Sequence, residues 1–418
     1  MTLLIRWLIR SITGLTLIAV CLPVFAGQSL VLMDKAALDK VKARVNAGQL
    51  NDSQTAVYDY LLARADHILQ QPNPTVVNKT LLPPTQSKHD YLSISRYWWP
   101  DPAKEDGLPW IRKDGITNPD TQTDAVDRPR IGRMATGVKT LALGYYLSGK
   151  AEYADKAAGM LRTWFLDEAT KMNPHLKFAQ SVPGNPNSRR SGILDGRLIP
   201  EQVLDSITLL SDSEYWSEKD DAAMNQWLRE YLDWLTQSKV GKQGAQQTNN
   251  HGSWYRFQVA ALAYYLDDKA LLSEAVEATK ASLASQLDKS GGQSHELSRT
   301  RSFFYSCFNL KALTSVAVVA ERAGTPFWDY TTSNNRSLEL ALDYLMPALI
   351  DPEAWPHPTA GIKQSDILAA LIEAKHKYPD TQYATTFDQV LQSLTISAEH
   401  SNILQLILSR HPEYLLLE

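Results

Sequence analysis

Two short segments in the second half of the chain carry side chains that together suit one kind of chemistry. The first runs from Asn249 to Tyr255 and contains an amide and an imidazole, and the second runs from Glu296 to Ser306 and contains guanidinium groups and a phenol. Such groups can donate hydrogen bonds to a carboxylate and exchange a proton. The set suits removal of a proton from a carbon next to a carboxylate. A glycoside hydrolase would instead normally need two carboxyl groups.

A uronic acid within a glycan shows how these residue types could act. Its C5 hydrogen lies next to the carboxylate, and its C4 oxygen carries the next sugar, so removing the proton and expelling the oxygen cleaves the chain without water. Charge develops beside the carboxylate, and Asn250, His251 and Arg299 are the candidates to stabilise it. Tyr305 is the candidate base if nearby cations lower its pKa from about 10, and its phenol could then protonate the leaving oxygen.

Each of these residues also has a structural interpretation. His251 could make a helix-start hydrogen bond, and Asn250 could be an N-cap or turn residue. Arg299 could pair with Glu296 at i,i+3, and Tyr305 could belong to the core. Arg299 and Tyr305 lie six positions apart, which is not one face of a helix, so a shared site requires a break between them.

Most of the chain has the apolar spacing of helices, and alternating strand patterns are scarce. The clearest helical stretches are 135–147, 151–166, 201–210, 222–235, 256–266, 271–287, 309–323, 337–349, 364–374, 386–394 and 401–408. The segment 145–151 is similar to 264–270, and each joins two such stretches through a short polar turn. Chance similarity of alanine-rich helices is the alternative. We expect an all-α protein of about six or seven helical hairpins, stacked as a solenoid or a toroid.

Two irregular segments, 82–133 and 173–197, interrupt the helical pattern and are expected to border a binding cleft. Aromatic faces in the first could stack on sugar rings, although some would only pin the loop to the body. Arg189 and Arg190 form a basic cluster in the second, and Arg301 is expected to support the site. The candidate substrate-binding residues are His89, Tyr91, Tyr97, Trp98, Trp99, Trp110, Arg112, Arg189, Arg190, Trp254, Tyr255 and Arg301.

The first 26 residues have the pattern of a signal peptide, and we expect the remainder, 27–418, to form a single domain. Arg6 and Arg10 flank a short apolar stretch, and small residues precede Gly27, where we expect cleavage. An uncleaved anchor or a lipoprotein processed at Cys21 are the alternatives. Cleavage would leave Cys307 as the only cysteine, and we expect a periplasmic or secreted protein without stable membrane association.

The charge of the chain and its motifs exclude several classes of function. The net charge of -4 becomes about -6 without the two arginines of the leader, so nucleic-acid binding is not expected and a polyanion would need a local basic cleft. His175, His295 and His357 lack metal-ligand spacing, and His411 is expected at the surface. The chain has no phosphate loop or nucleophile elbow, so we expect neither a metal nor another cofactor.

Three ordered motifs within about residues 80–320 resemble those of the alginate lyase superfamily of polysaccharide lyases. They are Tyr97–Pro102 with Gly107–Arg112, Asn249–Tyr255, and Glu296–Arg301 with Tyr305–Ser306 and Phe308–Leu310. The chain resembles polysaccharide lyase family 38 more than family 5, and its third motif lacks the Tyr-His pattern of family 5, so the resemblance does not by itself imply specificity for alginate.

The resemblance implies an incomplete α/α toroid and metal-independent β-elimination on a polyuronate. It also implies that Asn250, His251 and Arg299 handle the carboxylate and that Tyr305 serves as base and acid. A further asparagine is expected in the preceding loop, with Asn187 the first candidate and Asn185 the second.

Three functions therefore compete on the sequence alone. The first is a lyase that cleaves a β-1,4-linked polyuronate, alginate or glucuronan. The second is an α/α-toroid glycoside hydrolase acting on uronic oligosaccharides, for which Asp90, Asp124, Asp127 and Asp195 are the acids available. The third is a glycan-binding protein without catalysis. The sequence does not determine the preferred uronate, endo or exo action, or oligomeric state.

Overall fold

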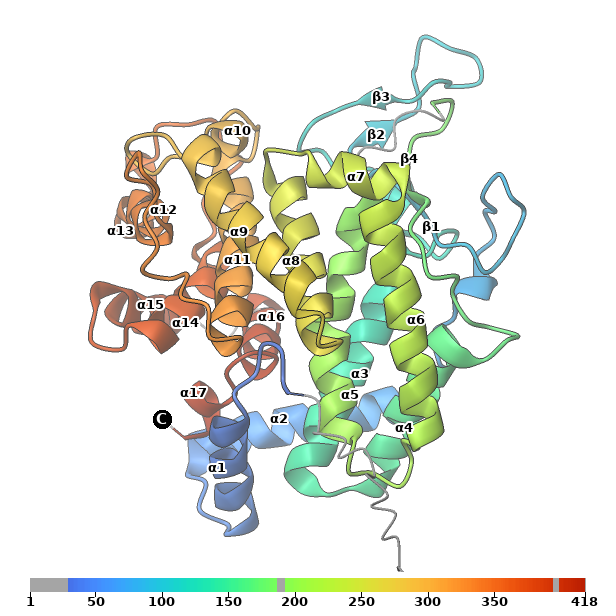
Figure 1. Cartoon of the computed structure of the whole chain (residues 1–418), viewed down its shortest axis with the longest axis vertical. Helices are drawn as coiled ribbons and strands as arrows, with labels where there is room; N and C mark the ends of the chain where they lie inside the picture. The colour runs from blue at the N-terminus through green and yellow to red at the C-terminus, as the bar shows by residue number, and fades with distance from the viewer. Residues whose placement is uncertain (1–28, 186–191, 394–397, 418) are drawn as a thin grey trace, which may run out of the picture.

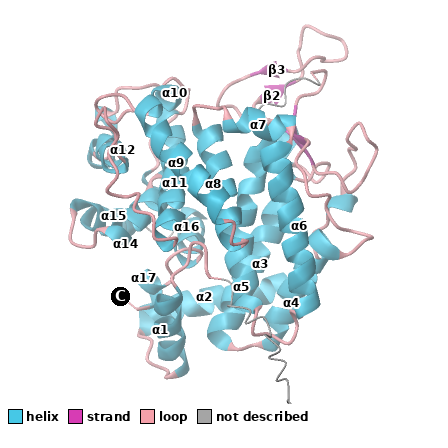
Figure 2. Cartoon of the chain, in the orientation of Figure 1, coloured by secondary structure: helices cyan, strands magenta, loops and turns pink. Residues whose placement is uncertain are grey.

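The computed structural model of the chain describes residues 29–185, 192–393 and 398–417, and helices make up most of it (Figures 1 and 2). The expected leader, with Cys21, lies outside the described residues. The helices of the first half are α1 (Lys35–Asn46), α2 (Asp52–Leu69), α3 (Arg128–Ser148), α4 (Ala151–Leu161), α5 (Leu204–Leu210) and α6 (Glu218–Gln237). Two π-helical turns, η3 (Arg162–Leu166) and η5 (Ile199–Val203), adjoin α4 and α5. The prediction of an all-α protein is confirmed.

The second half continues in the same way, and each helical stretch expected there overlaps an observed helix, although 337–349 divides into two helices and 364–374 begins in a 3-10 turn. The helices are α7 (Lys239–Ala245), α8 (Asn250–Tyr265), α9 (Lys269–Gln286), α10 (Ser294–Leu297), α11 (Ser302–Arg322), α12 (Leu338–Leu345), α13 (Pro347–Ile350), α14 (Leu368–Lys377), α15 (Gln382–Ser393), α16 (Ala398–Leu408) and α17 (Glu413–Leu416). Short 3-10 turns are η1 (Val76–Asn78), η2 (Pro119–Gln122), η4 (Gly192–Arg197), η6 (Pro352–Ala354) and η7 (Gln364–Asp366).

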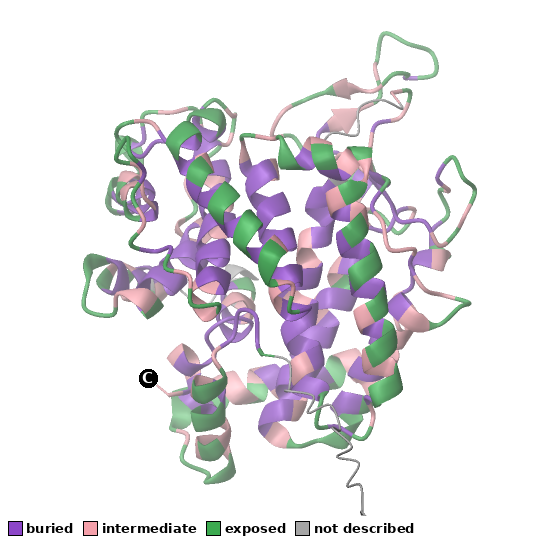
Figure 3. Cartoon of the chain, viewed as in Figure 1, coloured by how far each residue is buried: buried purple, intermediate pink, exposed green. Residues whose placement is uncertain are grey.

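The helices form an inner set and an outer set. Helices α3, α8 and α11 are buried around most of their circumference, whereas α6 and α9 expose a polar stripe, as Figure 3 shows. An inner helix is covered on every side and is therefore apolar all round. Helix α11 is long and apolar enough to span a membrane by length and composition. Its position in the inner set explains this, because 78% of its most apolar window is buried inside the protein.

The two similar segments of the sequence are turns of two helical hairpins. The chain passes from α3 to α4 through Gly149, which has a φ of 72° and ends the helix in the left-handed conformation. It passes from α8 to α9 through Asp267, which has a φ of 57°. In each case the two helices pack against one another as expected.

The two irregular segments meet at one end of the inner helices, at the top of Figure 1. Strand β1 (Leu92–Ile94) pairs in parallel with β4 (Phe178–Ser181), and β2 (Trp98–Trp99) pairs antiparallel with β3 (Ile111–Arg112). The backbone N–H of Trp110 donates to the carbonyl of Pro183 over 3.1 Å, which joins the two segments directly. They therefore form a common rim, which lies above α7 in Figure 1.

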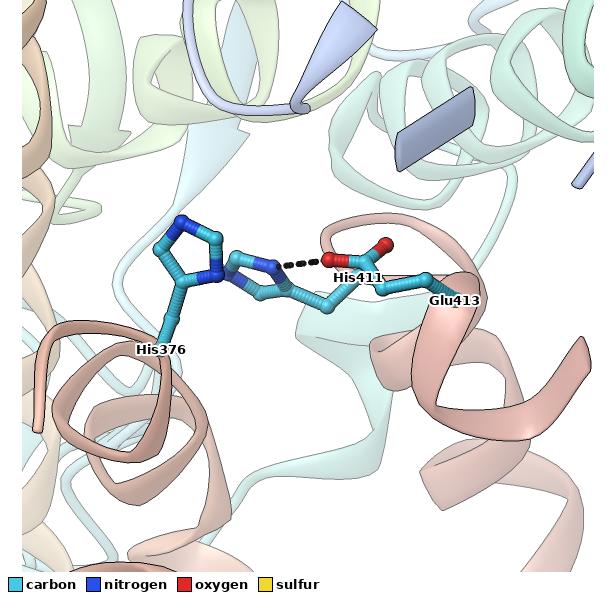
Figure 4. A group of neighbouring side chains, drawn as sticks. All are labelled: His376, His411 and Glu413. Carbon is cyan, nitrogen blue, oxygen red and sulfur yellow. Dashed lines mark hydrogen bonds and ion pairs between the residues drawn. The ribbon is translucent and has the colours of Figure 1, made fainter. Parts of the chain in front are cut away.

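At the opposite end, the C-terminal residues are fixed by buried charges, and the expectation of a surface position for His411 is wrong. The His411 ring is 1% exposed and lies between two carboxylates, with Nδ1 2.9 Å from Glu413 and Nε2 3.0 Å from Glu373. Figure 4 shows the ring between His376 and Glu413. Burial alone would lower the pKa of His411, but the two carboxylates more than offset this and raise it to about 9.

Candidate active site

A cleft of about 780 Å³ opens between the rim and the ends of α8 and α11. This volume lies in the upper part of the range of about 300–1,000 Å³ that is typical of small-molecule sites. The side chains that line it come from the two irregular segments, the start of α8, the loop before α11 and the first turns of α11. All four residues expected to be catalytic, Asn250, His251, Arg299 and Tyr305, are among them.

The first turn of α8 presents two of these residues. Asn249 is the N-cap, and its side chain accepts a hydrogen bond from the backbone N–H of His251 over 3.1 Å. Glu296 holds Asn250, since its two carboxylate oxygens accept from the backbone N–H over 2.7 Å and from Nδ2 over 2.8 Å. The pKa of Glu296 is raised, because the effect of burial is larger than the lowering effect of the two hydrogen bonds from Asn250. Glu296 thus fixes the amide from behind.

A break between helices brings Arg299 onto Tyr305, as the sequence required. Helix α10 ends at Leu297 and α11 begins at Ser302, so Arg299 lies in a loop and Tyr305 in the first turn of α11. The Arg299 guanidinium carbon stands 3.7 Å from the centroid of the Tyr305 ring. The i,i+3 pair with Glu296 is replaced by a forked pair with Asp114, to which Nε donates over 3.1 Å and Nη2 over 2.7 Å.

The environment of the Tyr305 phenol differs from the one expected for a base. Its hydroxyl donates to the hydroxyl of Tyr97 over 2.9 Å, and the residue is 8% exposed. Burial raises the pKa of Tyr305 well above its usual value, and the stacked Arg299 only partly reverses this. The condition on which Tyr305 would serve as a base, a pKa lowered by nearby cations, is therefore not met in this structure, because the desolvation cost of a phenolate is larger.

The cleft is strongly cationic although the chain carries a net negative charge. Its described lining includes five arginines, Arg96, Arg112, Arg128, Arg197 and Arg299, but Asp195 is the only acid there. A concave site lined by one sign of charge attracts ligands of the opposite sign. The expected local basic cleft is present.

The four acids considered for hydrolysis are engaged elsewhere. Asp195 accepts from Arg128, Tyr91 and Ser93; burial raises its pKa, but Arg128, Ser93 and Arg197 lower it by more. Asp127 accepts from the backbone of Leu92, and Asp90 from Asn173. Asp124 is exposed and pairs with Arg133. Among the described residues, no pair of carboxyl groups faces the cleft, so the arrangement is unsuited to the two-carboxylate mechanism.

The expected substrate-binding residues divide into three groups. Tyr97, Trp98 and Arg112 line the cleft, as does the alternative asparagine Asn185. Asn187, Arg189 and Arg190 lie outside the described residues. The others do not line the cleft: His89, Tyr91, Trp99, Trp110, Trp254, Tyr255 and Arg301.

Most residues of the last group hold the site in place. Tyr91 and Trp254 are completely buried, which contradicts a direct contact with substrate; Tyr91 donates to Asp195 instead. Tyr255 is 8% exposed and packs near α7. The indole of Trp99 donates to the carbonyl of Ile116 over 3.1 Å, which is a contact within the first irregular segment.

The other residues of this group make contacts of the same kind. His89 bonds the carbonyl of Lys171, and Arg301 stacks on Phe304.

Sequence reasoning missed several polar residues of the cleft. Arg96, Arg128 and Arg197 were not singled out, nor were Gln122, Gln180 and Gln247. A signal was available for the arginines, because Arg96 directly precedes the Tyr97 motif and Arg197 ends the second irregular segment. The roles of Asp114 and Glu296 could not be read from spacing, since their partners are distant in sequence.

Comparisons with known proteins agree with this arrangement. A family model described as alginate lyase matches residues 75–355. The structure of an alginate lyase from Bacteroides ovatus is 32% identical, covers 90% of this chain and 99% of its own, and has a TM-score of 0.82. Alginate lyase A1-III from Sphingomonas species A1 is 16% identical, covers 84% of this chain and 91% of its own, and has a TM-score of 0.56.

A tyrosine-to-phenylalanine variant of A1-III, complexed with a tetrasaccharide, is 15% identical, covers 85% of this chain and 91% of its own, and has a TM-score of 0.58. No curated protein matches the chain. The distant likenesses support the incomplete α/α toroid implied by the resemblance. Because the family model spans well over half of the sequence, and the Bacteroides enzyme is similar over almost its whole length, the chain belongs to the alginate lyase family and is a polysaccharide lyase.

Proposed function

We propose that this enzyme cleaves a β-1,4-linked polyuronate, alginate or glucuronan, by β-elimination. One observation carries the proposal: the Tyr305 phenol lies under the Arg299 guanidinium in a cleft whose described lining holds five arginines and a single acid. Such a cleft suits a chain of carboxylates. The Bacteroides and Sphingomonas proteins are both described as alginate lyases, which supports a substrate of this class.

In the proposed mechanism, the carboxylate of the reacting uronate is bound first. Asp114 accepts the Nε hydrogen and one Nη2 hydrogen of Arg299, so the two hydrogens of Nη1 and the second hydrogen of Nη2 are left to bind the substrate. The amide of Asn250 and the ring of His251 face the same cleft. As the C5 proton leaves, negative charge spreads onto the carboxylate, and these donors stabilise it more strongly than in the ground state.

Tyr305 then moves the proton. Its phenolate takes the C5 proton, the electrons of that bond form the C4–C5 double bond, and the C4–O4 bond breaks. The phenol so formed protonates O4, so that Tyr305 returns to the phenolate and the leaving sugar departs as a neutral alcohol. Because burial raises the pKa of Tyr305, the phenolate is scarce at neutral pH, and we expect kcat/KM to rise with pH into the alkaline range. A fall over the same range would instead identify Tyr305 as the acid alone.

The experiment that tests this function is ultraviolet absorbance during incubation with polymannuronate, polyguluronate, glucuronan and a glycosaminoglycan. A new absorbance from the unsaturated product with one of the first three is expected. Reducing ends without absorbance would refute elimination and favour the hydrolase, whereas binding without either product would favour a glycan-binding protein.

A matched variant tests the role of the phenol. Tyr305→Phe removes one oxygen, so it should reduce turnover by at least about a thousandfold while polymer binding is largely kept. Tyr330→Phe, a change of the same type outside the cleft, serves as control. Near-normal turnover of Tyr305→Phe would refute the assignment.

We also propose that the enzyme is exported to the periplasm or beyond and leaves the membrane after cleavage. The leader pattern of residues 1–26 supports this. The body of the protein begins just beyond it, since Asp205 accepts backbone hydrogen bonds from Val31 over 2.5 Å and from Met33 over 3.1 Å. N-terminal sequencing of the exported protein should begin at Gly27, and a retained leader would refute cleavage.

A further inference from the structure

A second, smaller cavity lies beside α3, away from the cleft. It has a volume of about 190 Å³ and is bounded by α2, α3, η5 and α16. Its lining shares no residue with the lining of the cleft. Lys139, which lines the smaller cavity, lies about three helical turns along α3 from Arg128, which lines the cleft. The two cavities are therefore separate sites.

The charge of the smaller cavity comes from two cations. Arg64 and Lys139 are the charged residues of its described lining, which contains no acid. Lys139 is 3% exposed, and the one described partner of its ammonium is Asp205, at 3.3 Å. Asp205 also accepts from the backbone N–H groups of Val31 and Met33, so its charge is shared. Because an ammonium has three N–H donors, Lys139 keeps donors for a ligand.

Burial makes this site attractive for an anion. It lowers the pKa of Lys139, Asp205 offsets that effect only in part, and the charge of Arg410 lowers the pKa further. A buried cation is stabilised by an opposite charge that approaches it. The second cation, Arg64, is half-buried, and its Nη2 donates over 2.6 Å to the side-chain oxygen of Gln405 when that amide is turned toward it. An anion that enters the cavity would meet both cations.

The rest of the lining suits hydroxyl groups and the apolar face of a ring. Gln202 and Asn402 contribute amides and Thr136 contributes a hydroxyl, and these groups both donate and accept hydrogen bonds, as sugar hydroxyls do. The amide of Gln202 makes no hydrogen bond to the residues that the structure describes. Apolar surface comes from Leu61, Leu143, Leu406 and Leu408. A bare inorganic anion would use only the donors, so this mixture favours a sugar acid.

We propose that this cavity is a second ligand site, which binds a single sugar acid of hexuronate size. Its carboxylate would lie against Lys139 and Arg64, and its hydroxyl groups against Gln202 and Asn402. The volume is below the range of about 300–1,000 Å³ typical of drug-sized ligands, so the cavity suits one sugar unit and not a polymer. The proposal does not rest on the function proposed for the cleft.

Calorimetry with three small probes tests the chemistry of the site. D-Glucuronate should bind, whereas D-glucose, in which a hydroxymethyl group replaces the carboxylate, should bind at least about tenfold more weakly. Inorganic phosphate, which has the charge without the ring, should also bind more weakly than glucuronate. Equal binding of glucose would refute the role of the two cations. Binding of phosphate alone would show a simple anion site, and no binding of glucuronate would show a cavity filled by water; either result overturns the proposal.

Variants locate the bound sugar. Arg64→Gln should weaken glucuronate binding at least about tenfold, because it removes one of the two charges. Arg133→Gln, at an exposed position of α3 outside both cavities, is the matched control and should bind normally. Arg299→Gln, in the cleft, should also keep this binding. Binding that is lost in Arg299→Gln but kept in Arg64→Gln would place the sugar in the cleft and overturn the proposal.

Thermal unfolding gives a second measurement of the same site. A ligand that binds only the folded protein raises its Tm, so glucuronate should raise the Tm of the wild-type enzyme and of Arg133→Gln, but not that of Arg64→Gln. Replacing Lys139 would also take the cation from Asp205 and disturb folding, so the half-buried Arg64 is the position to change. An equal rise in Tm for Arg64→Gln and Arg133→Gln would overturn the assignment of this cavity.

Discussion

The ion pairs of His411 make the stability of the protein depend on pH in a direction that can be worked out. His411 lies between Glu373 and Glu413, and its pKa is raised to about 9 in the folded protein. An unfolded histidine titrates near 6.5. The folded state therefore binds the proton more tightly. The resulting stabilisation is fully present below about pH 6.5 and is lost as the pH rises through 9.

The size of the effect follows from the difference between the two pKa values. It amounts to about 2.5 pKa units, and at about 1.4 kcal/mol per unit the imidazolium contributes on the order of 3 kcal/mol. Glu373, whose pKa is lowered to about 2, belongs to the same interaction and is not counted again. For a protein of ordinary stability this is a substantial fraction of the total.

Urea unfolding of the wild-type enzyme and of His411→Gln measures this contribution. The glutamine does not titrate, so the stability difference between the two proteins should shrink by about 3 kcal/mol between pH 6 and pH 10. His67→Gln, at an exposed position of α2, reports the effect of removing a histidine as such. A difference that stays constant across this range would show that His411 is not held as a buried cation.

Two further predictions concern the contact between the rim and the catalytic loop. Asp114→Asn keeps the size of the side chain but removes the charge that orients Arg299, so kcat should fall about 10- to 100-fold, as expected for a lost charged hydrogen bond of ~1.5–3 kcal/mol; an unchanged kcat would contradict this. Gly115→Ala places a methyl group 2.5 Å from Thr300 Oγ1 at a φ of 77°, so it should push the rim away from the loop before α11 and raise KM. Gly48→Ala, with a φ of 64° and open space around it, is the control that bears only the backbone strain. Equal KM values for the two variants would contradict a role for this contact between the rim and the loop.

Most of the helical framework could be predicted from the sequence because inner helices repeat a strong pattern. The stretches 256–266 and 309–323 fall on α8 and α11, which are buried on most sides and are rich in apolar residues. Helices α1 and α2 were not identified. Each buries only a narrow stripe, including Leu38 and Val41 in α1, and leaves the rest polar. These two helices are positioned by packing against the rest of the fold. A narrow apolar stripe gives only a weak periodic pattern in the sequence, so the two helices are hard to predict from it.

The candidate site was predictable where its residues are close in sequence. Asn250 and His251 are neighbours at a helix start, and the break between Arg299 and Tyr305 followed from their spacing. A lowered pKa of Tyr305 was only a condition for its role as base, and burial in the folded cleft raises that pKa instead. The number of cations near a residue can be guessed from sequence, but its exposure to water cannot.

Two acids, Asp195 in the lining of the cleft and Asp114 behind Arg299, are paired with arginines and are not placed to act as catalysts themselves. Asp114 accepts from Arg299 across 185 positions of sequence, and Asp195 accepts from Arg128 across 67. Each carboxylate orients a guanidinium before substrate arrives, and an oriented donor costs less reorganisation as charge develops. Placed this way, the acids are already paired and are poor proton donors. A cationic cleft whose acids are paired with its arginines is therefore suited to stabilising a carboxylate-centred anion and unsuited to hydrolysis.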